Sequence, residues 1–130
     1  AAWLHDMGSI LYGREDHHIT GAEIAEKKLR ELNYPKEKRE LVKKCILNHR
    51  GSVNNNKETV EEQIIADADV MSHFDNIGGI FMAALIFEKK NQLEARDSVR
   101  EKLVNSWNKL SPNSKQLIKP KYEAAMLLLN

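Results

Sequence analysis

Residues that break helices are scarce in this chain of 130 residues, which contains six glycines and three prolines. Polar and apolar residues do not alternate with a period of two for more than a few positions, as a half-buried strand would require. Apolar residues instead recur at a spacing close to 3.6, as in Ala22, Ala25, Leu29 and Leu32. This pattern predicts an all-α fold, a single compact bundle of several helices over residues 1–130.

Two pairs of residues have the spacing of a capping box, in which a side chain accepts from the exposed amides of the first helical turn. Thr20 with Glu23 predicts a helix that begins after Thr20, and Thr59 with Glu62 predicts a second such helix. We expect other helices from Pro35 to Gly51, over 93–110 and over 113–129, with a loop over 52–57.

Four further expectations concern the last helix, burial and the start of the chain. Pro120 should kink or interrupt the last helix, and the nearly apolar stretch 80–87 should be buried. The chain starts at Ala1 with apolar, helix-forming residues and no capping residue, which predicts that the full protein has residues upstream. Five aromatic residues are expected in the core: Trp3, Phe74, Phe81, Phe87 and Trp107.

Charge and composition limit the partners of the chain. Twenty Lys and Arg residues against nineteen Asp and Glu give a net charge of +1, so no overall field attracts nucleic acid. The longest nearly apolar run, 77–87, is too short to cross a bilayer, and we expect no membrane partner. The single cysteine excludes an intrachain disulfide and fits a reducing cytoplasm. Function is therefore expected from a local site.

Histidines and aspartates form the chemically informative pattern. His5 and Asp6 are adjacent and offer a metal one imidazole nitrogen and one carboxylate oxygen, although such a pair can also be a surface feature. On a helix Asp69 shares the face of Ile65, so an inward carboxylate there must bind a cation or form a buried salt bridge. Asp67 points about 200° away, as a surface partner or as support for a ligand.

The other histidines divide into two groups. His49 continues an inward stripe at the end of its helix and is either a core residue or part of a site rim. His17 and His18 precede a predicted helix start, where surface histidines are the alternative. Cys45 is interpreted as a small buried residue and not as a nucleophile. Three residues are candidate cations of the site, Arg14, Arg50 and Lys57. His73 and Asp75 belong either to the site or to the outer edge of their helix.

Four segments carry these residues: Ala1-Ala2-Trp3-Leu4-His5-Asp6-Met7-Gly8, His17 before Gly21-Ala22-Glu23, Ile46-Leu47-Asn48-His49 and Ile65-Ala66-Asp67-Ala68-Asp69. Taken in this order along the chain, they resemble the HD-domain superfamily of metal-dependent phosphohydrolases. The resemblance covers the motif-bearing part, 1–88, whereas the C-terminal helices over 89–130 match only in being helical.

The resemblance implies that His5, Asp6 and Asp69 are catalytic metal ligands, and that His17 and His49 complete a site for one or two ions. The family's first histidine ligand would lie before residue 1. Imidazole and carboxylate ligands together suit Mn²⁺, Fe²⁺, Co²⁺, Ni²⁺ or Zn²⁺. Four residues are placed around these ligands, to support them or to contact substrate: His18, Arg50, Lys57 and Asp67.

The activity that the resemblance implies is hydrolysis of a phosphoester by water that a metal activates. A nucleotide or another small phosphorylated molecule is the expected substrate, and a second copy of the chain is a further candidate partner. One alternative is a catalytically degenerate HD domain that senses nucleotides or binds a partner. A purely structural helical domain and oxygen-dependent cleavage at two irons also stay open.

Overall fold

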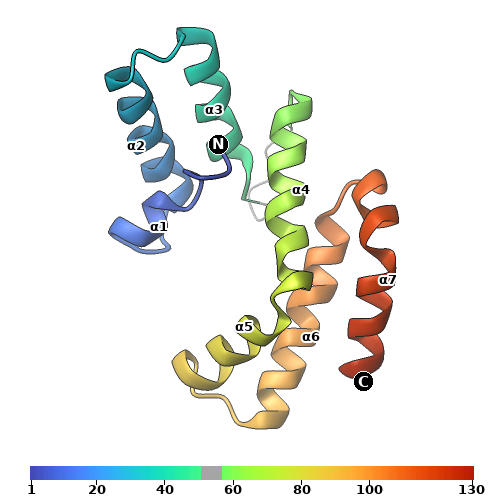
Figure 1. Ribbon diagram of the computed structural model, residues 1–130. Helices are drawn as coiled ribbons and strands as arrows, with labels where there is room; N and C mark the ends of the chain where they lie inside the picture. Colours follow the sequence, from blue (N-terminus) through green and yellow to red (C-terminus); the bar gives the residue numbers. More distant parts are fainter. Residues whose placement is uncertain (51–56) are drawn as a thin grey trace. The chain divides into compact units, whose positions relative to one another are not determined.

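The computed structural model describes residues 1–50 and 57–130, and the regular elements within them are all helical (Figure 1). The all-α prediction is confirmed. The predicted helix end at Gly51 and most of the predicted loop 52–57 lie outside the described residues. The elements are α1 (Met7–Tyr12), α2 (His17–Glu31), α3 (Lys36–Asn48), α4 (Val60–Asp75), α5 (Ile77–Met82), the π-helical turn η1 (Ala83–Phe87), α6 (Gln92–Lys109) and α7 (Pro112–Leu128).

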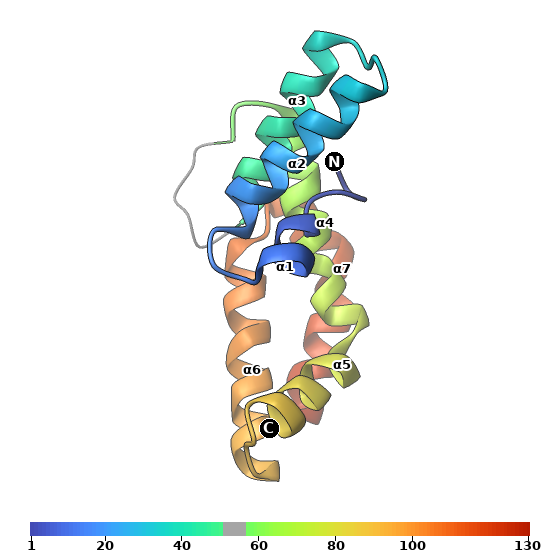
Figure 2. The same cartoon turned by 90° about the vertical axis from the view of Figure 1, so that its left-hand side faces the viewer.

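The chain forms two compact units, residues 1–66 and 67–130, and the division falls within α4. In the first unit α2 and α3 lie side by side (Figure 2). Ala22 and Ala25 of α2 and Ile46 of α3 form the buried cluster between them, with Leu4 and Val42 packed against it. The organisation of residues 1–130 as one domain stays a prediction.

The start of α2 differs from the prediction. The helix begins at His17 and not after Thr20, and its N-cap is Asp16, in the left-handed region at φ 48°. The hydroxyl of Thr20 donates back to the carbonyls of Asp16 and His17, both at 3.4 Å. The predicted capping box was wrong because Thr20 already lies within a helical turn, where its hydroxyl reaches carbonyls of the preceding turn.

The start of α4 follows the prediction. The backbone N–H of Glu62 donates to Oγ1 of Thr59 at 3.2 Å, and the Thr59 hydroxyl donates to the Glu62 carboxylate at 3.0 Å. Pro35, expected as the first residue of its helix, lies one position earlier, at the N-cap of α3.

The second unit has its own core, built on α4, α6 and α7. Its buried residues are Val70, Phe74, Val99, Leu103, Leu110, Ile118, Ala125 and Leu129. Asn91 and Glu94 form a capping box at the start of α6, and Ser111 caps α7. The helix α7 continues through Pro120, with Ile118 and Ala125 buried on either side, so the predicted interruption does not occur and a kink there stays a prediction.

Burial of 80–87 was predicted wrongly. Ala84 is buried, but four neighbours are exposed, Met82, Leu85, Ile86 and Phe87, and Phe87 is 81% exposed. Trp3 is 95% exposed, so Trp3 and Phe87 do not belong to the core, whereas Phe74 does. A stretch that is apolar on every side does not specify which face packs.

Among the described residues, no single helix is long and apolar enough to cross a bilayer. The segments Val60–Asp75 and Ile77–Phe87 reach that length only as a pair, bent by 77°.

Candidate metal centre

Three candidate ligands meet in the first unit. Ligand atoms of His5, Asp6 and His49 all lie within 4.8 Å of one another. His5 and Asp6 immediately precede α1, and His49 ends α3. The carboxylate of Asp6 does not cap α1, so the helix start does not occupy it.

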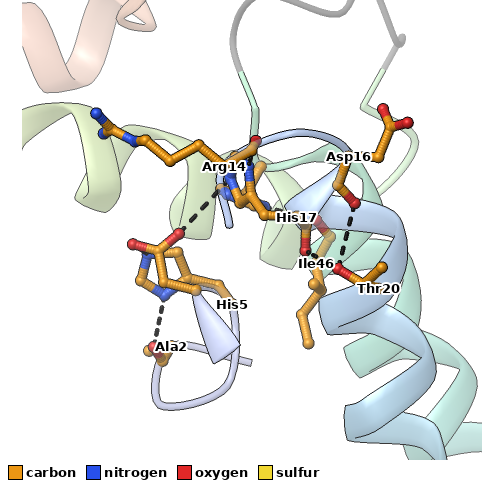
Figure 3. A network of polar contacts seen from close by, with 9 residues as sticks. Ala2, His5, Arg14, Asp16, His17, Thr20 and Ile46 are labelled. Carbon is orange, nitrogen blue, oxygen red and sulfur yellow. Dashed lines mark hydrogen bonds and ion pairs between the residues drawn. The ribbon is translucent and has the colours of Figure 1, made fainter. Parts of the chain in front are cut away.

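His17 joins this group from the first position of α2. Its Nε2 atom lies 3.6 Å from Oδ1 of Asp6, and Nε2 of His5 lies 3.4 Å from Oδ2 of the same carboxylate. Figure 3 labels both histidines and shows the hydrogen bond from His5 to Ala2. Two ligands that are each about 2.1 Å from one ion lie about 3.0–3.4 Å apart. Each of the two nitrogens therefore lies about as far from its own oxygen of Asp6 as two ligands of one ion lie from each other.

The three imidazole rings are held in the same way. Nδ1 of each donates to the backbone carbonyl three positions earlier, at 2.7 Å for His5, 2.9 Å for His17 and 2.5 Å for His49. With the proton on Nδ1, the lone pair of each ring is on Nε2, the form in which histidine binds metals. The accepting carbonyls are those of Ala2, Arg14 and Ile46.

Two glycines bring the His5–Asp6 pair close to α2. A Cβ atom on Gly8 would overlap the carbonyl oxygen of His17 and lie 2.7 Å from the backbone nitrogen of Gly21. A Cβ atom on Gly21 would lie 3.1 Å from the carbonyl oxygen of His5. Larger residues would force α1 and α2 apart, and the imidazole of His17 would move away from Asp6.

The polar residues proposed around the ligands differ in burial. His18 is 9% exposed, and its buried Nδ1 has no hydrogen-bond partner. Burial lowers the pKa of His18, and the nearby charges of Arg50 and His17 lower it further, whereas Asp16 acts in the opposite direction. Arg50 and Lys57 are half-buried.

The family model for the HD domain matches residues 1–73, more than half of the chain. The chain belongs to the HD-domain family. No curated protein and no solved structure matches it.

The HD-domain match confirms the resemblance inferred from the motifs and includes every candidate ligand, Asp69 among them. HD domains are typically hydrolases that bind divalent metals, and the grouping of His5, Asp6 and His49 is one candidate site for such a metal. Asp69 lies in the second unit, half-buried on α4. Its role as a ligand stays a prediction.

The other aspartate of this segment of the HD domain has a different environment. Asp67 is 6% exposed, so the first of its two expected roles, a surface partner, is wrong. Its carboxylate accepts from the backbone N–H of Ser111 at 3.2 Å and from the hydroxyls of Ser111 and Ser114 at 2.5 and 2.7 Å. These donors come from the start of α7, far away in the sequence, and no local pattern indicated them. The other expected role of Asp67, support for a metal ligand, stays a prediction.

His73 and Asp75, which were expected either in the site or at the outer edge of their helix, have partners in the second unit. Nδ1 of His73 lies 2.9 Å from Oγ of Ser106, and Asp75 pairs with Lys121. Cys45 is buried, and burial raises the pKa of its thiol. This agrees with its interpretation as a small buried residue and not as a nucleophile.

Sequence reasoning assigned Glu62 only a capping role, but its carboxylate is completely buried. It accepts from Nδ2 of Asn48 at 2.6 Å as well as from Thr59. Burial by itself raises the pKa of Glu62, but these hydrogen bonds outweigh burial and hold the pKa below its ordinary range. Glu62 thus connects the start of α4 to the last turn of α3, immediately before His49.

Proposed function

We propose that this HD domain is a metal-dependent phosphohydrolase that cleaves a phosphoester of a nucleotide or another small phosphorylated substrate. The observation that carries the proposal is the arrangement of His5, His17 and His49 near the Asp6 carboxylate, each ring with Nδ1 on a backbone carbonyl. An arrangement that fixes three imidazoles in one tautomer favours ligand nitrogens over surface histidines.

The residues have distinct roles in this proposal. Nε2 of each histidine and the carboxylate of Asp6 would hold a divalent transition metal, and Asp69 would add a carboxylate from α4. With a divalent ion held by these residues, the pKa of a bound water would fall toward about 7, which would supply the nucleophile for attack on phosphorus.

The test compares metal content and hydrolysis in the same preparations. The protein is reconstituted with Mn²⁺, Co²⁺ or Zn²⁺, and turnover of nucleotides and of a generic phosphoester is measured. We expect His5→Ala, Asp6→Ala and Asp69→Ala to lose both activity and metal while circular dichroism shows unchanged helicity. His73→Ala, a histidine of the second unit, is the matched control and should retain both.

The proposal fails if the metal-loaded protein hydrolyses none of these substrates, or if the three variants stay active. Calorimetric titration of the metal-free protein with nucleotides covers the alternative. Tight binding without turnover would indicate a degenerate, nucleotide-sensing domain.

A further inference from the structure

The end of α3, which leads directly into the candidate ligand His49, is connected to the start of α4 at two successive turns. Asn48, the last residue of α3, donates from Nδ2 to Oε2 of Glu62 at 2.6 Å. One turn earlier on α3, Lys44 pairs with Glu58, whose carboxylate lies 2.8 Å from Nζ. Side chains of the two segments therefore meet twice, once at the surface and once in the interior.

The two contacts differ in burial. The side chains of Lys44 and Glu58 are 52% and 68% exposed, and an exposed ion pair of this kind holds its partners only weakly. The carboxylate of Glu62 is instead completely buried, and its other oxygen accepts from the hydroxyl of Thr59 at 3.0 Å. A buried carboxylate is costly unless donors satisfy it, so the folded chain strongly favours keeping Asn48 in contact with Glu62.

The imidazole of His49 depends on the turn that this contact holds. Its Nδ1 donates to the carbonyl of Ile46 at 2.5 Å, and Ile46 and Asn48 both belong to the last turn of α3. Carbonyls of a last turn lack donors within the helix, and helix ends fray. The last turn of α3 contains no basic side chain that would interact favourably with the helix dipole. The bond from Asn48 to Glu62 therefore stabilises the turn that supplies the acceptor for His49.

We propose that Glu62 is a positioning residue for the candidate metal centre, because it holds Asn48 and through it the imidazole of His49. This inference rests on the proposed function, which makes Nε2 of His49 a metal ligand. Glu62 is not itself a ligand here, since its two oxygens accept from Asn48 and Thr59. Loss of the bond to Asn48 should weaken the metal site in a chain that still folds.

The test measures the dissociation constant of Co²⁺ for the full chain, by a titration that follows the visible absorption of the bound ion. Asn48→Ala removes the donor but has high helix propensity, so α3 should still form. It should weaken Co²⁺ binding about tenfold, the lower end of the loss when a supporting partner of a metal ligand is removed. Glu58→Gln is the matched control. It breaks the exposed contact between the same two segments and should leave the dissociation constant unchanged.

Double variants separate positioning from a general loss of stability. If Glu62 acts through Asn48, Glu62→Ala combined with Asn48→Ala should bind Co²⁺ no more weakly than Asn48→Ala alone. In a His49→Ala background, Asn48→Ala should change the dissociation constant less than about twofold, because the residue that it positions is already absent. Glu62→Gln keeps a carbonyl that accepts from Asn48 and should retain most of the affinity that Glu62→Ala loses.

A second readout needs no metal. Nitrogen NMR of the imidazole of His49 in the metal-free chain reports which ring nitrogen carries the proton. The Nδ1–H form should dominate in the unchanged protein, where Nδ1 donates to Ile46, and also in Glu58→Gln. Asn48→Ala should show a mixture of the two tautomers, while circular dichroism shows unchanged helicity.

The inference is overturned if Asn48→Ala keeps both the Co²⁺ affinity and the His49 tautomer of the unchanged protein, or if it weakens binding equally with and without His49. A chain that shows the expected coupling but hydrolyses no phosphoester would contradict the proposed function alone. Failure of the unchanged chain to bind Co²⁺ would overturn both.

Discussion

His17 and His49 lie at the ends of different helices, yet their imidazole rings meet edge to face with centroids 5.4 Å apart. His17 begins α2 and His49 follows the last residue of α3. Since α2 and α3 pack side by side through Ala22, Ala25 and Ile46, the buried cluster between them fixes the separation of the two rings. The packing of the first unit thus determines the geometry of its candidate metal ligands.

This relationship predicts that metal binding stabilises the folded chain. Mn²⁺ or Zn²⁺ at a hundred times its dissociation constant should add about 2.7 kcal/mol to the free energy of unfolding. Thermal unfolding followed by circular dichroism, with and without metal, measures the effect. His17→Ala should remove most of the increase and His73→Ala none. An equal increase in both variants would contradict the ligand role of His17.

Gly8 should be intolerant of a side chain. In Gly8→Ala the new methyl group would overlap the backbone carbonyl of His17, and we expect a loss of about 3 kcal/mol or more in stability, together with weaker metal binding. Gly78 is the matched control, because a Cβ atom there meets nothing within 4 Å. Gly78→Ala in α5 should stabilise the protein by about 0.5 kcal/mol. Urea denaturation of both variants tests the contrast, and similar losses would refute it.

Asp67 and Asp69 should respond in opposite ways to the same substitution. Asp67→Asn weakens the hydrogen bonds to Ser111 and Ser114 and should cost about 2–3 kcal/mol of stability without loss of metal. Asp69→Asn should lower metal content and leave stability of the metal-free protein nearly unchanged. Elemental analysis and denaturation on the same samples distinguish the two, and metal loss only in Asp67→Asn would reverse the assignment.

Glu62 should give the stability of the protein a dependence on pH. Its folded-state pKa lies below the ordinary value of 4.5, so the ionised carboxylate stabilises the fold above that pH, and the contribution disappears as the pH falls through the folded-state pKa. Glu62→Gln should therefore cost about 1–2 kcal/mol at pH 7 and progressively less below about pH 4. Glu61→Gln, at an exposed position, is the control. A difference independent of pH would contradict the role of the charge.

Local patterns predicted much of this molecule. Helical periodicity was enough for the all-α fold, and the cap at Thr59 placed the start of α4. The predicted helix 113–129 lies within one residue of α7 at both ends. The His5–Asp6 pair and the histidines that follow identified the family, because their order along the chain is itself the signal.

Contacts between residues that lie far apart in the sequence could not be predicted from those patterns. The partners of Asp67 come from α7, and the exposure of Phe87 depends on which face of a uniformly apolar turn packs. The start of α2 was misplaced because Thr20 with Glu23 satisfies the spacing of a capping box while lying inside the helix. In each case the deciding contact lies outside the local pattern that supported the prediction.

The hydrogen bonds from Nδ1 of His5, His17 and His49 to backbone carbonyls also determine when side-chain freedom is lost. These rings give up their rotational entropy when the chain folds, before any ion arrives, so metal binding would not have to order them again. A short peptide with the same histidines would still have to order them, and it should bind the same ion more weakly for that reason alone.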